Sequence, residues 1–358
     1  MKTIVSCFVF CLLLTQGSLA QPFAYVVNQT SEDVSIIDTA VNTVAGQPIG
    51  VELAPSAIAI TPDGRRAYVA NLASGNVSVI DIVSGRTIGS PIAVGASPEG
   101  IAITPDGTRA YVTNGGSDTV SVIDTASNTV IGPPIPVGTM PLGIAITPDG
   151  TRAYVANGDS SSVSVIDTAT NMNVGSIAVG LAPFGIAITP DGTRAYVALR
   201  SFDAVAVIDT TTNTLAGPNI LVGGTPVNLA ITPDGKRVYV SNISTNDVWV
   251  IATLTNSVIG SPIIVGNNPR GIAITPDGAR AYVANEVDNT VSVIDTATNM
   301  LLGSPIAVGS SPRDVAIAPP PEPLVRNVPT LSEWGLIAAA GILGLASVAA
   351  IRRRKAAA

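Results

Sequence analysis

The chain has 358 residues, of which 46% are hydrophobic and 12% are charged, and its formal net charge is −7. Globular proteins average about 25% charged residues, so this chain is unusually poor in charge. It contains no histidine. That excludes Ser-His-Asp and Cys-His catalysis and any histidine-ligated zinc, copper or haem. An acidic chain whose only basic run lies at its C-terminus also argues against a nucleic-acid partner.

The first 20 residues have the pattern of a secretory signal peptide. A lysine at position 2 precedes the apolar run 4–14, and Ser18 and Ala20 are the small residues of a cleavage site. An uncleaved anchor helix is the alternative, but the run has 11 residues, whereas a membrane span needs ~20. We expect the mature chain to begin at Gln21. Both cysteines lie before this point, so the mature protein has no thiol and no disulfide.

The body of the chain is one unit repeated seven times. Seven tyrosines, each followed by valine, recur at intervals of 43, 43, 43, 42, 43 and 43 residues. They are Tyr25, Tyr68, Tyr111, Tyr154, Tyr196, Tyr239 and Tyr282. No unit shows the 3.6-residue periodicity of a helix, and each has runs rich in β-branched residues between turn residues. The short interval reflects a one-residue deletion in the segment NMNVGSIAVG.

One unit illustrates the expected strands: residues 100–104, 109–114, 119–124 and 129–137. The turn between the third and fourth runs has asparagine in six units and Gly85 in the other, which predicts a left-handed backbone there. Six units also carry an arginine two places before the tyrosine, which we interpret as a hydrogen-bond donor between neighbouring units. Four antiparallel strands per unit of about 43 residues is the pattern of a β-propeller blade.

The ends of the body predict how the ring closes. The N-terminal unit lacks its first strand, and a matching segment, residues 313–318, stands alone at the other end. We therefore predict an all-β, seven-bladed β-propeller over residues 21–318, closed by a C-terminal strand in the N-terminal blade. By its spacing and its Tyr-Val-Ala-Asn or Tyr-Val-Thr-Asn motifs, this body resembles the YVTN family of β-propeller repeat proteins. That resemblance implies an exported or surface-displayed protein and assigns no activity.

The connections differ between the two faces of the predicted disc. The first and third connections of each blade are nearly uniform, whereas the second connection and the links between blades vary. Structural constraint thus concentrates on one face, so we expect any binding site on the variable one. The link residue after a recurrent proline should ring one mouth of the central channel. These residues are Ser56, Glu99, Leu142, Phe184, Val227, Arg270 and Arg313.

Six residues near this mouth are the candidate binding residues. They are Glu99, Phe184, Asn228, Arg270, Arg313 and Asp314. Phe184 offers apolar area, and the arginines, in adjacent blades, offer planar donors for a carboxylate or phosphate. Asn228 and Asp314 replace the glycine or alanine of the other units. The repeated aspartates of the turns are read as turn formers, so no catalytic residue, metal or cofactor is assigned.

Two functions follow from this reading. The first is a non-catalytic binding or structural module for adhesion or the extracellular matrix, with a surface polysaccharide or a protein as ligand. The alternative is a propeller enzyme of lactonase-like type with its site at the channel mouth. The absence of a recognisable catalytic constellation favours the first.

The C-terminal segment predicts a membrane anchor. A proline-rich linker, 319–327, precedes 18 uncharged residues, 334–351, and then a basic run, 352–355. At ~1.5 Å per residue, such a helix measures roughly 27 Å, close to the ~30 Å hydrocarbon core of a bilayer. The basic run keeps the C-terminus in the cytoplasm. We therefore expect a transmembrane helix over residues 334–351.

The segment 328–355 also resembles the IPTL-CTERM sorting signal, in which a short motif precedes a transmembrane helix and a basic end. Val328 stands in place of the usual isoleucine. The matching residues are Pro329, Thr330, Leu331, Ser332, Glu333 and Trp334. The resemblance implies processing by an exosortase-type enzyme, a transient anchor in the inner membrane, and a final location at the cell surface or outside the cell. An ordinary C-terminal anchor is the alternative.

Overall fold

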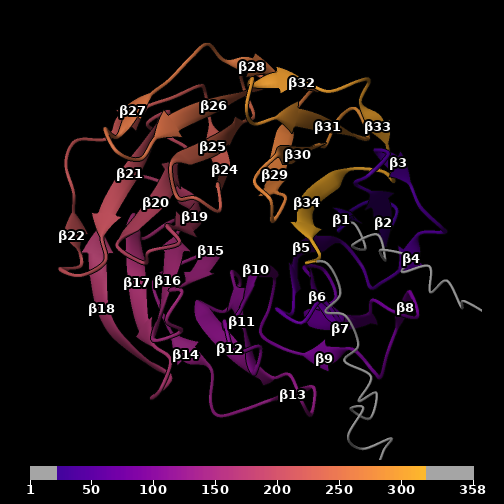
Figure 1. Ribbon diagram of the computed structural model, residues 1–358. Coiled ribbons are helices and arrows are strands. Elements are labelled where there is room, and N and C mark those ends of the chain that lie inside the picture. Colours follow the sequence, from indigo (N-terminus) through magenta and orange to yellow (C-terminus); the bar gives the residue numbers. More distant parts are fainter. Residues whose placement is uncertain (1–21, 320–358) are drawn as a thin grey trace, which may run out of the picture. The chain divides into compact units, whose positions relative to one another are not determined.

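A computed structural model describes residues 22–319. Seven antiparallel sheets surround a central channel, which confirms the all-β, seven-bladed propeller (Figure 1). The predicted signal peptide and the predicted sorting signal with its helix lie outside the described residues. Within residues 22–319, no helix is long and apolar enough to cross a membrane.

The innermost strand of each blade lies beside the channel. We number the N-terminal blade as blade 1. Its innermost strand is β34 (Pro312–Ile317). The innermost strands of blades 2 to 7 are, in order, β5 (Pro55–Ile60), β10 (Pro98–Ile103), β15 (Pro141–Ile146), β19 (Pro183–Ile188), β24 (Pro226–Ile231) and β29 (Pro269–Ile274). Each begins at the recurrent proline, one or two residues before the predicted start. The link residues are therefore part of the strands that line the mouth.

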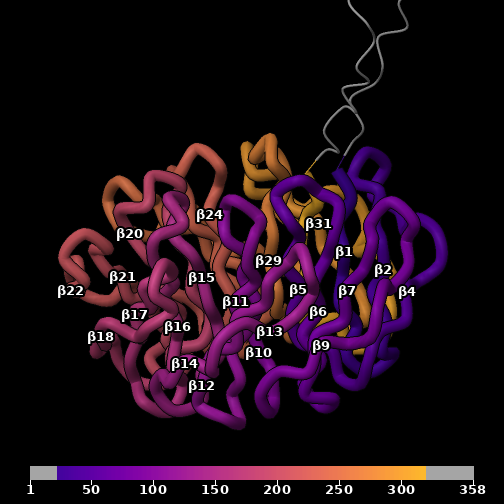
Figure 2. The backbone as a smooth tube through the Cα atoms, turned by 90° about the horizontal axis from the view of Figure 1, so that it is seen from below, coloured from indigo at the N-terminus to yellow at the C-terminus, as the bar shows by residue number. Residues whose placement is uncertain are grey.

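The next two strands of each blade are six residues long and regular. The second strands are β1 (Phe23–Asn28), β6 (Arg66–Asn71), β11 (Arg109–Asn114), β16 (Arg152–Asn157), β20 (Arg194–Leu199), β25 (Arg237–Asn242) and β30 (Arg280–Asn285). The third strands are β2 (Asp33–Asp38), β7 (Asn76–Asp81), β12 (Thr119–Asp124), β17 (Ser162–Asp167), β21 (Ala204–Asp209), β26 (Asp247–Ala252) and β31 (Thr290–Asp295). Seen from the side, the blades together form a disc (Figure 2).

The prediction of one continuous outer strand is wrong in six blades. Their outer strands are pairs of two-residue pieces: β3 (Thr43–Val44) with β4 (Ile49–Gly50), β8 (Arg86–Thr87) with β9 (Ile92–Ala93), β13 (Thr129–Val130) with β14 (Ile135–Pro136), β22 (Thr214–Leu215) with β23 (Ile220–Leu221), β27 (Ser257–Val258) with β28 (Ile263–Ile264), and β32 (Met300–Leu301) with β33 (Ile306–Ala307). In each of these six blades a glycine with positive φ, such as Gly132 at 70°, interrupts the outer strand between its two pieces. In blade 4 the deletion removes the break, and β18 (Met172–Ala178) is continuous.

Closure takes place as predicted. Strand β34 pairs antiparallel with β1, with Tyr25 opposite Ala316 and Val26 opposite Val315. The first and last described segments of the propeller thus share blade 1. This pairing leaves the ring without a free inner edge, which is the usual way in which propellers avoid exposed strands.

The hydrophobic core consists of seven clusters, one at each junction between neighbouring blades. Both sides of the second strand are buried, since each blade packs between two others. At the junction of blades 2 and 3, Tyr68 donates to Asn128 Oδ1 at 2.6 Å and Arg66 to the carbonyl oxygen of Thr125 at 2.5 Å. Six junctions contain both bonds, so the predicted role of the arginines as donors between blades is correct.

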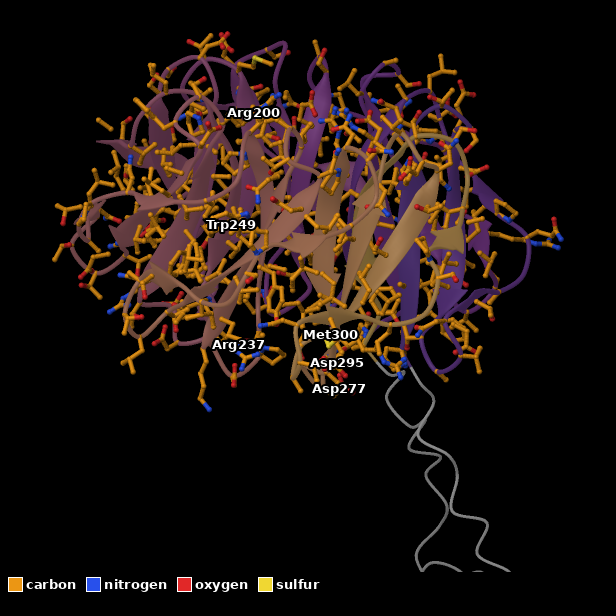
Figure 3. All side chains as sticks on the ribbon, turned by 90° about the horizontal axis from the view of Figure 1, so that it is seen from above. Arg200, Arg237, Trp249, Asp277, Asp295 and Met300 are labelled. Carbon is orange, nitrogen blue, oxygen red and sulfur yellow. The ribbon has the colours of Figure 1, made fainter. Side chains whose placement is uncertain are left out.

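The two faces of the disc carry different connections. Arg200, in the second connection of blade 5, lies near one face, and Asp277 and Asp295, in the uniform turns, lie near the other (Figure 3). The left-handed turn position is observed as predicted: Asn128 has a φ of 55° and Gly85 a φ of 64°. The variable face therefore presents loops that the packing of the blades leaves free to differ.

Candidate functional site

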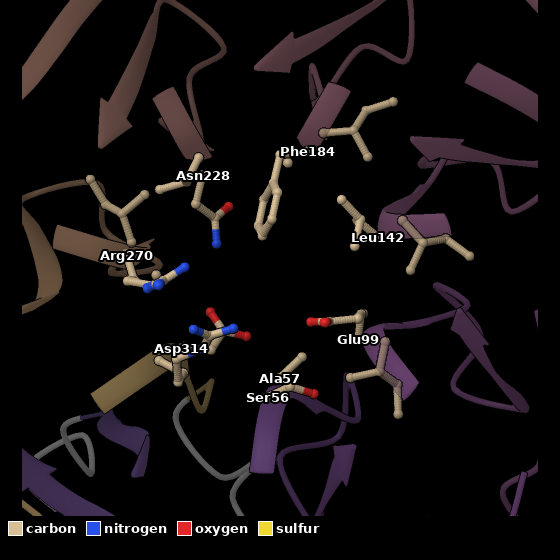
Figure 4. Close-up of a pocket in the computed structure, with 18 residues that line it drawn as sticks. Ser56, Ala57, Glu99, Leu142, Phe184, Asn228, Arg270 and Asp314 are labelled. Atoms are coloured by element: carbon tan, nitrogen blue, oxygen red, sulfur yellow. The ribbon is translucent and has the colours of Figure 1, made fainter. Parts of the chain in front are cut away.

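A pocket of about 200 Å³ opens at one mouth of the channel. Two rings of residues from the innermost strands form its wall. We call the first of them the mouth ring, and its seven members are Ser56, Glu99, Leu142, Phe184, Val227, Arg270 and Arg313. The next residue of each strand belongs to the channel ring: Ala57, Gly100, Gly143, Gly185, Asn228, Gly271 and Asp314. The structure thus brings all six candidate binding residues into one pocket (Figure 4).

The glycines of the channel ring allow the innermost strands to approach closely. A Cβ atom on Gly100 would lie 2.4 Å from the carbonyl oxygen of Leu142, and one on Gly143 would lie 2.4 Å from that of Phe184. Real Cβ atoms do not tolerate such contacts, so these positions require glycine. Asn228 and Asp314 are accommodated in blades 6 and 1, and both place polar groups at the channel.

Glu286 joins the two arginines of the mouth ring. It lies in the second connection of blade 7, and its Oε2 accepts hydrogen bonds from Arg270 Nε at 2.5 Å and from Asn268 Nδ2 at 2.8 Å. Its Oε1 lies 3.3 Å from Arg313 Nη1. All three charged side chains are less than one-fifth exposed. One carboxylate therefore fixes two guanidinium groups from adjacent blades, and each guanidinium keeps further N–H donors for a ligand.

A third arginine lies above the ring. The guanidinium carbon of Arg200 is 5.0 Å from the centroid of the Phe184 ring, a cation–π distance. Burial lowers the pKa of Arg200, and the nearby positive charge of Arg313 lowers it further. Burial also lowers the pKa of Arg270, and Arg313 and Arg200 contribute in the same direction. Three arginines thus lie within electrostatic reach of one another at this mouth, and Glu286 and Glu99 partly offset their charge.

Two carboxyl groups line the same pocket. Burial raises the pKa of Glu99, although the charges of Arg313, Arg270 and Arg200 partly oppose the shift. Burial raises the pKa of Asp314 to about 7, against hydrogen bonds that its carboxylate accepts from the backbone amides of Ile58 and Val315. Figure 4 shows the Glu99 carboxylate pointing into the centre of the pocket from the side opposite Arg270. Glu99 is thus a partly buried carboxyl group within electrostatic reach of three arginines.

Glu286 and Arg200 are not among the six predicted site residues. Both occupy the position directly after the second strand of their blades. Across the seven blades this position holds Gln29, Leu72, Gly115, Gly158, Arg200, Ile243 and Glu286. Of these seven residues only Arg200 and Glu286 are charged. A charged residue at a position that is uncharged in the other five blades is the sequence signal for these two site residues. Among residues 22–319, no group of three or more His, Cys, Asp or Glu side chains is arranged to hold a metal ion.

The fold and this pocket define a seven-bladed propeller with an open pocket of mixed charge at one channel mouth. Residues 16–261 match the model of the family described as "Lactonase, 7-bladed beta-propeller". The match spans more than half of the chain, so the protein belongs to this family. No curated protein sequence matches the chain.

Several solved structures share the fold. Hydrazine synthase from Kuenenia stuttgartiensis is 27% identical with a TM-score of 0.66, and the match covers 74% of this chain and 92% of that one. A functionally unknown protein from Desulfotomaculum acetoxidans is 21% identical with a TM-score of 0.73, covering 83% and 99%. A putative 6-phosphogluconolactonase from Bacteroides fragilis is 19% identical with a TM-score of 0.70, covering 83% and 98%. The last two resemblances concern the fold alone.

Proposed function

We propose that the protein is a lactone hydrolase whose substrate carries an anionic group and binds in the pocket of the mouth ring. Membership of the lactonase family and the similarity of fold to a putative 6-phosphogluconolactonase support this enzyme-like alternative over the non-catalytic adhesion module. The observation that carries the proposal is the position of Glu99, a partly buried carboxyl group that shares one pocket with Arg270 and Arg313.

The proposed reaction uses Glu99 as the general base. Its carboxylate removes a proton from a water molecule while the water oxygen attacks the carbonyl carbon of the lactone. The ring C–O bond breaks, and Glu99 returns the proton to the alkoxide oxygen, so the product is a hydroxy acid. A carboxyl group whose pKa is raised by burial is a stronger base than an exposed one.

The arginines supply the electrostatic part of the reaction. Glu286 holds Arg270 and Arg313 in place, and their remaining N–H groups bind the anionic group of the substrate and stabilise the charge that develops on the carbonyl oxygen. Because the guanidinium groups are already fixed by an ion pair, little conformational entropy is lost when the substrate binds.

The test is hydrolysis of a panel of five- and six-membered lactones, with and without a carboxylate, followed as acid release. General acid–base catalysis contributes about 10²–10⁴-fold, so Glu99→Gln should lower the rate by at least about 100-fold without lowering the melting temperature. Asp159→Asn removes an exposed carboxylate from the second connection of blade 4 and should leave the rate unchanged. If the wild-type protein hydrolyses no lactone of the panel, the proposal is wrong. If Glu99→Gln keeps full activity, Glu99 is not the base.

We retain the proposals on cellular location and partners. Export by the segment 1–20, processing of the segment 328–355 by an exosortase-type enzyme and display at the cell surface are supported by the sequence patterns. A surface polysaccharide or protein remains the ligand of the non-catalytic alternative. Mass spectrometry of the mature protein tests the processing proposal, which expects Gln21 as the first residue and loss of residues 352–355.

A further inference from the structure

The mouth ring is divided into two continuous arcs, one with polar and charged side chains and one with apolar side chains. Arg313, Ser56, Glu99 and Arg270 come from blades 1, 2, 3 and 7, which are adjacent around the ring. The remaining members, Leu142, Phe184 and Val227, come from blades 4, 5 and 6. We call these the charged arc and the apolar arc. The wall of the pocket therefore presents charged side chains such as Arg270 and Glu99 in one part and Leu142 and Phe184 in the other (Figure 4).

The apolar arc offers few groups to which a hydroxyl could bond. Leu142 and Val227 are 5% and 1% exposed. The carbonyl oxygen of Leu142 already accepts a 2.6 Å hydrogen bond from Thr113 Oγ1. The Oδ1 of Asn228 bonds to the backbone amide of Leu229, which leaves its Nδ2 as a donor at this side of the pocket. A hydroxyl placed against the leucine and valine side chains, away from Asn228 Nδ2, would lose its water without gaining a partner, and that is unfavourable.

Phe184 is the centre of the apolar arc. Its ring projects toward the middle of the pocket, and the Arg200 guanidinium covers it at 5.0 Å. A cavity of about 150 Å³ lined by apolar side chains is large enough for benzene. The pocket measures about 200 Å³. By this measure it is of the right size for one lactone ring with a carboxylate.

From this division we infer the substrate class: a monoanionic lactone that carries an alkyl or aryl substituent and no hydroxyl groups on the side facing blades 4 to 6. The inference rests on the proposed function and makes it more specific. The carboxylate lies against Arg270 and Arg313, and the substituent packs against Phe184. Hydrolysis of such a lactone gives a hydroxy dicarboxylic acid with an apolar side group.

The experiment compares three probes in two assays. The lactones are 5-oxotetrahydrofuran-3-carboxylate, its 2-phenyl derivative, and the phosphorylated, polyhydroxylated 6-phosphoglucono-δ-lactone. Hydrolysis is followed as acid release, and binding of the three ring-opened acids is measured by calorimetry. We expect the phenyl compound to bind and react at least 10-fold better than the unsubstituted one, and the hydroxylated compound to be the poorest.

The variants test whether Phe184 causes this preference. Phe184→Ala should remove most of the 10-fold advantage of the phenyl compound over the unsubstituted one, and Phe184→Leu should restore part of that ratio. Phe202→Ala is the matched control, because Phe202 is an exposed aromatic residue in the second connection of the same blade. Preference for the hydroxylated compound, or an unchanged phenyl preference in Phe184→Ala, overturns the inference.

The two assays separate this inference from the proposed function. If no lactone is hydrolysed but the phenyl-bearing acid binds best, the proposed hydrolysis is wrong and the ligand class is supported. If the hydroxylated lactone is hydrolysed best, the hydrolase proposal is supported and the inferred substrate class is wrong.

Discussion

The hydroxyl group of Tyr68 donates a 2.6 Å hydrogen bond to Asn128 Oδ1 and so connects blade 2 to a turn of blade 3. The equivalent bond recurs at five other junctions. At the junction of blades 1 and 2 the equivalent residues are Tyr25 and Gly85. Glycine has no side-chain acceptor, and within residues 22–319 the Tyr25 hydroxyl has no comparable bond. Burial raises the pKa of Tyr25 to about 12.

Gly85→Asn should therefore stabilise the protein. Gly85 already has the left-handed φ of 64° that the asparagines adopt, and a Cβ atom there would meet nothing within 4 Å. A new hydrogen bond together with a less flexible unfolded chain should add about 1 kcal/mol to the free energy of unfolding, or about 2 °C in melting temperature. Asn128→Gly, the reverse change at an intact junction, should lower the stability by a similar amount. Equal melting curves for Gly85→Asn and the wild type would contradict this account.

Closure of the ring predicts the effect of a truncation. A chain that ends after residue 319 keeps β34, whereas a chain that ends after residue 311 exposes the edge of β1 to solvent. We expect the shorter chain to melt at least several degrees lower and to aggregate, because an open edge pairs readily with other strands. Both chains lack the tail, so the comparison isolates the strand. Identical melting and solubility would show that blade 1 does not need β34.

The repeat explains why so much of the fold could be predicted. Strand number, ring closure and the left-handed turn all depend on residues at a fixed spacing, such as Tyr68 and Asn128, and a sequence displays that spacing directly. The break at Gly132 was not predicted, since β-branched residues continue on both sides of it and the sign of φ at a glycine is set by the tertiary context.

The site was only partly predictable for a related reason. Convergence of the mouth ring follows from the repeat, because equivalent positions must surround the same axis. The bond between Glu286 and Arg270 joins the second connection of blade 7 to the segment that links blade 6 to blade 7. No spacing rule of the repeat relates those two positions. Three-dimensional structure was needed to show that one carboxylate holds two arginines.

The buried carboxyl group of Asp314 predicts a pH dependence of stability. Its pKa is raised from 3.8 to about 7 in the folded protein, so the folded state binds the proton more tightly than the unfolded state. The stability contribution is fully present below about pH 4 and is lost as the pH rises through 7, at up to about 1.4 kcal/mol per pH unit. Asp314→Asn removes the titration, and its free energy of unfolding should vary less between pH 5 and 8. Denaturant titrations at pH 5 and pH 8 give the free energy of unfolding of each protein at both values. An equal change in that free energy between the two pH values in Asp314→Asn and the wild type would refute the prediction.

Arg270 and Arg313 should control the binding of anionic substrates in particular. Each is largely buried and keeps free N–H donors beside its ion pair with Glu286. Replacing both by glutamine removes the positive charge of the charged arc while retaining polar, hydrogen-bonding side chains. Loss of two charge-assisted hydrogen bonds, each worth about 1.5–3 kcal/mol, should raise the KM for a carboxylate-bearing lactone by at least about 100-fold. An uncharged lactone of the same size lacks these bonds, so its KM should change little. Arg65→Gln, which removes an exposed charge in the turn between β5 and β6, is the control for net charge. If the double variant affects charged and uncharged lactones equally, the arginines maintain the shape of the pocket and do not recognise the anion.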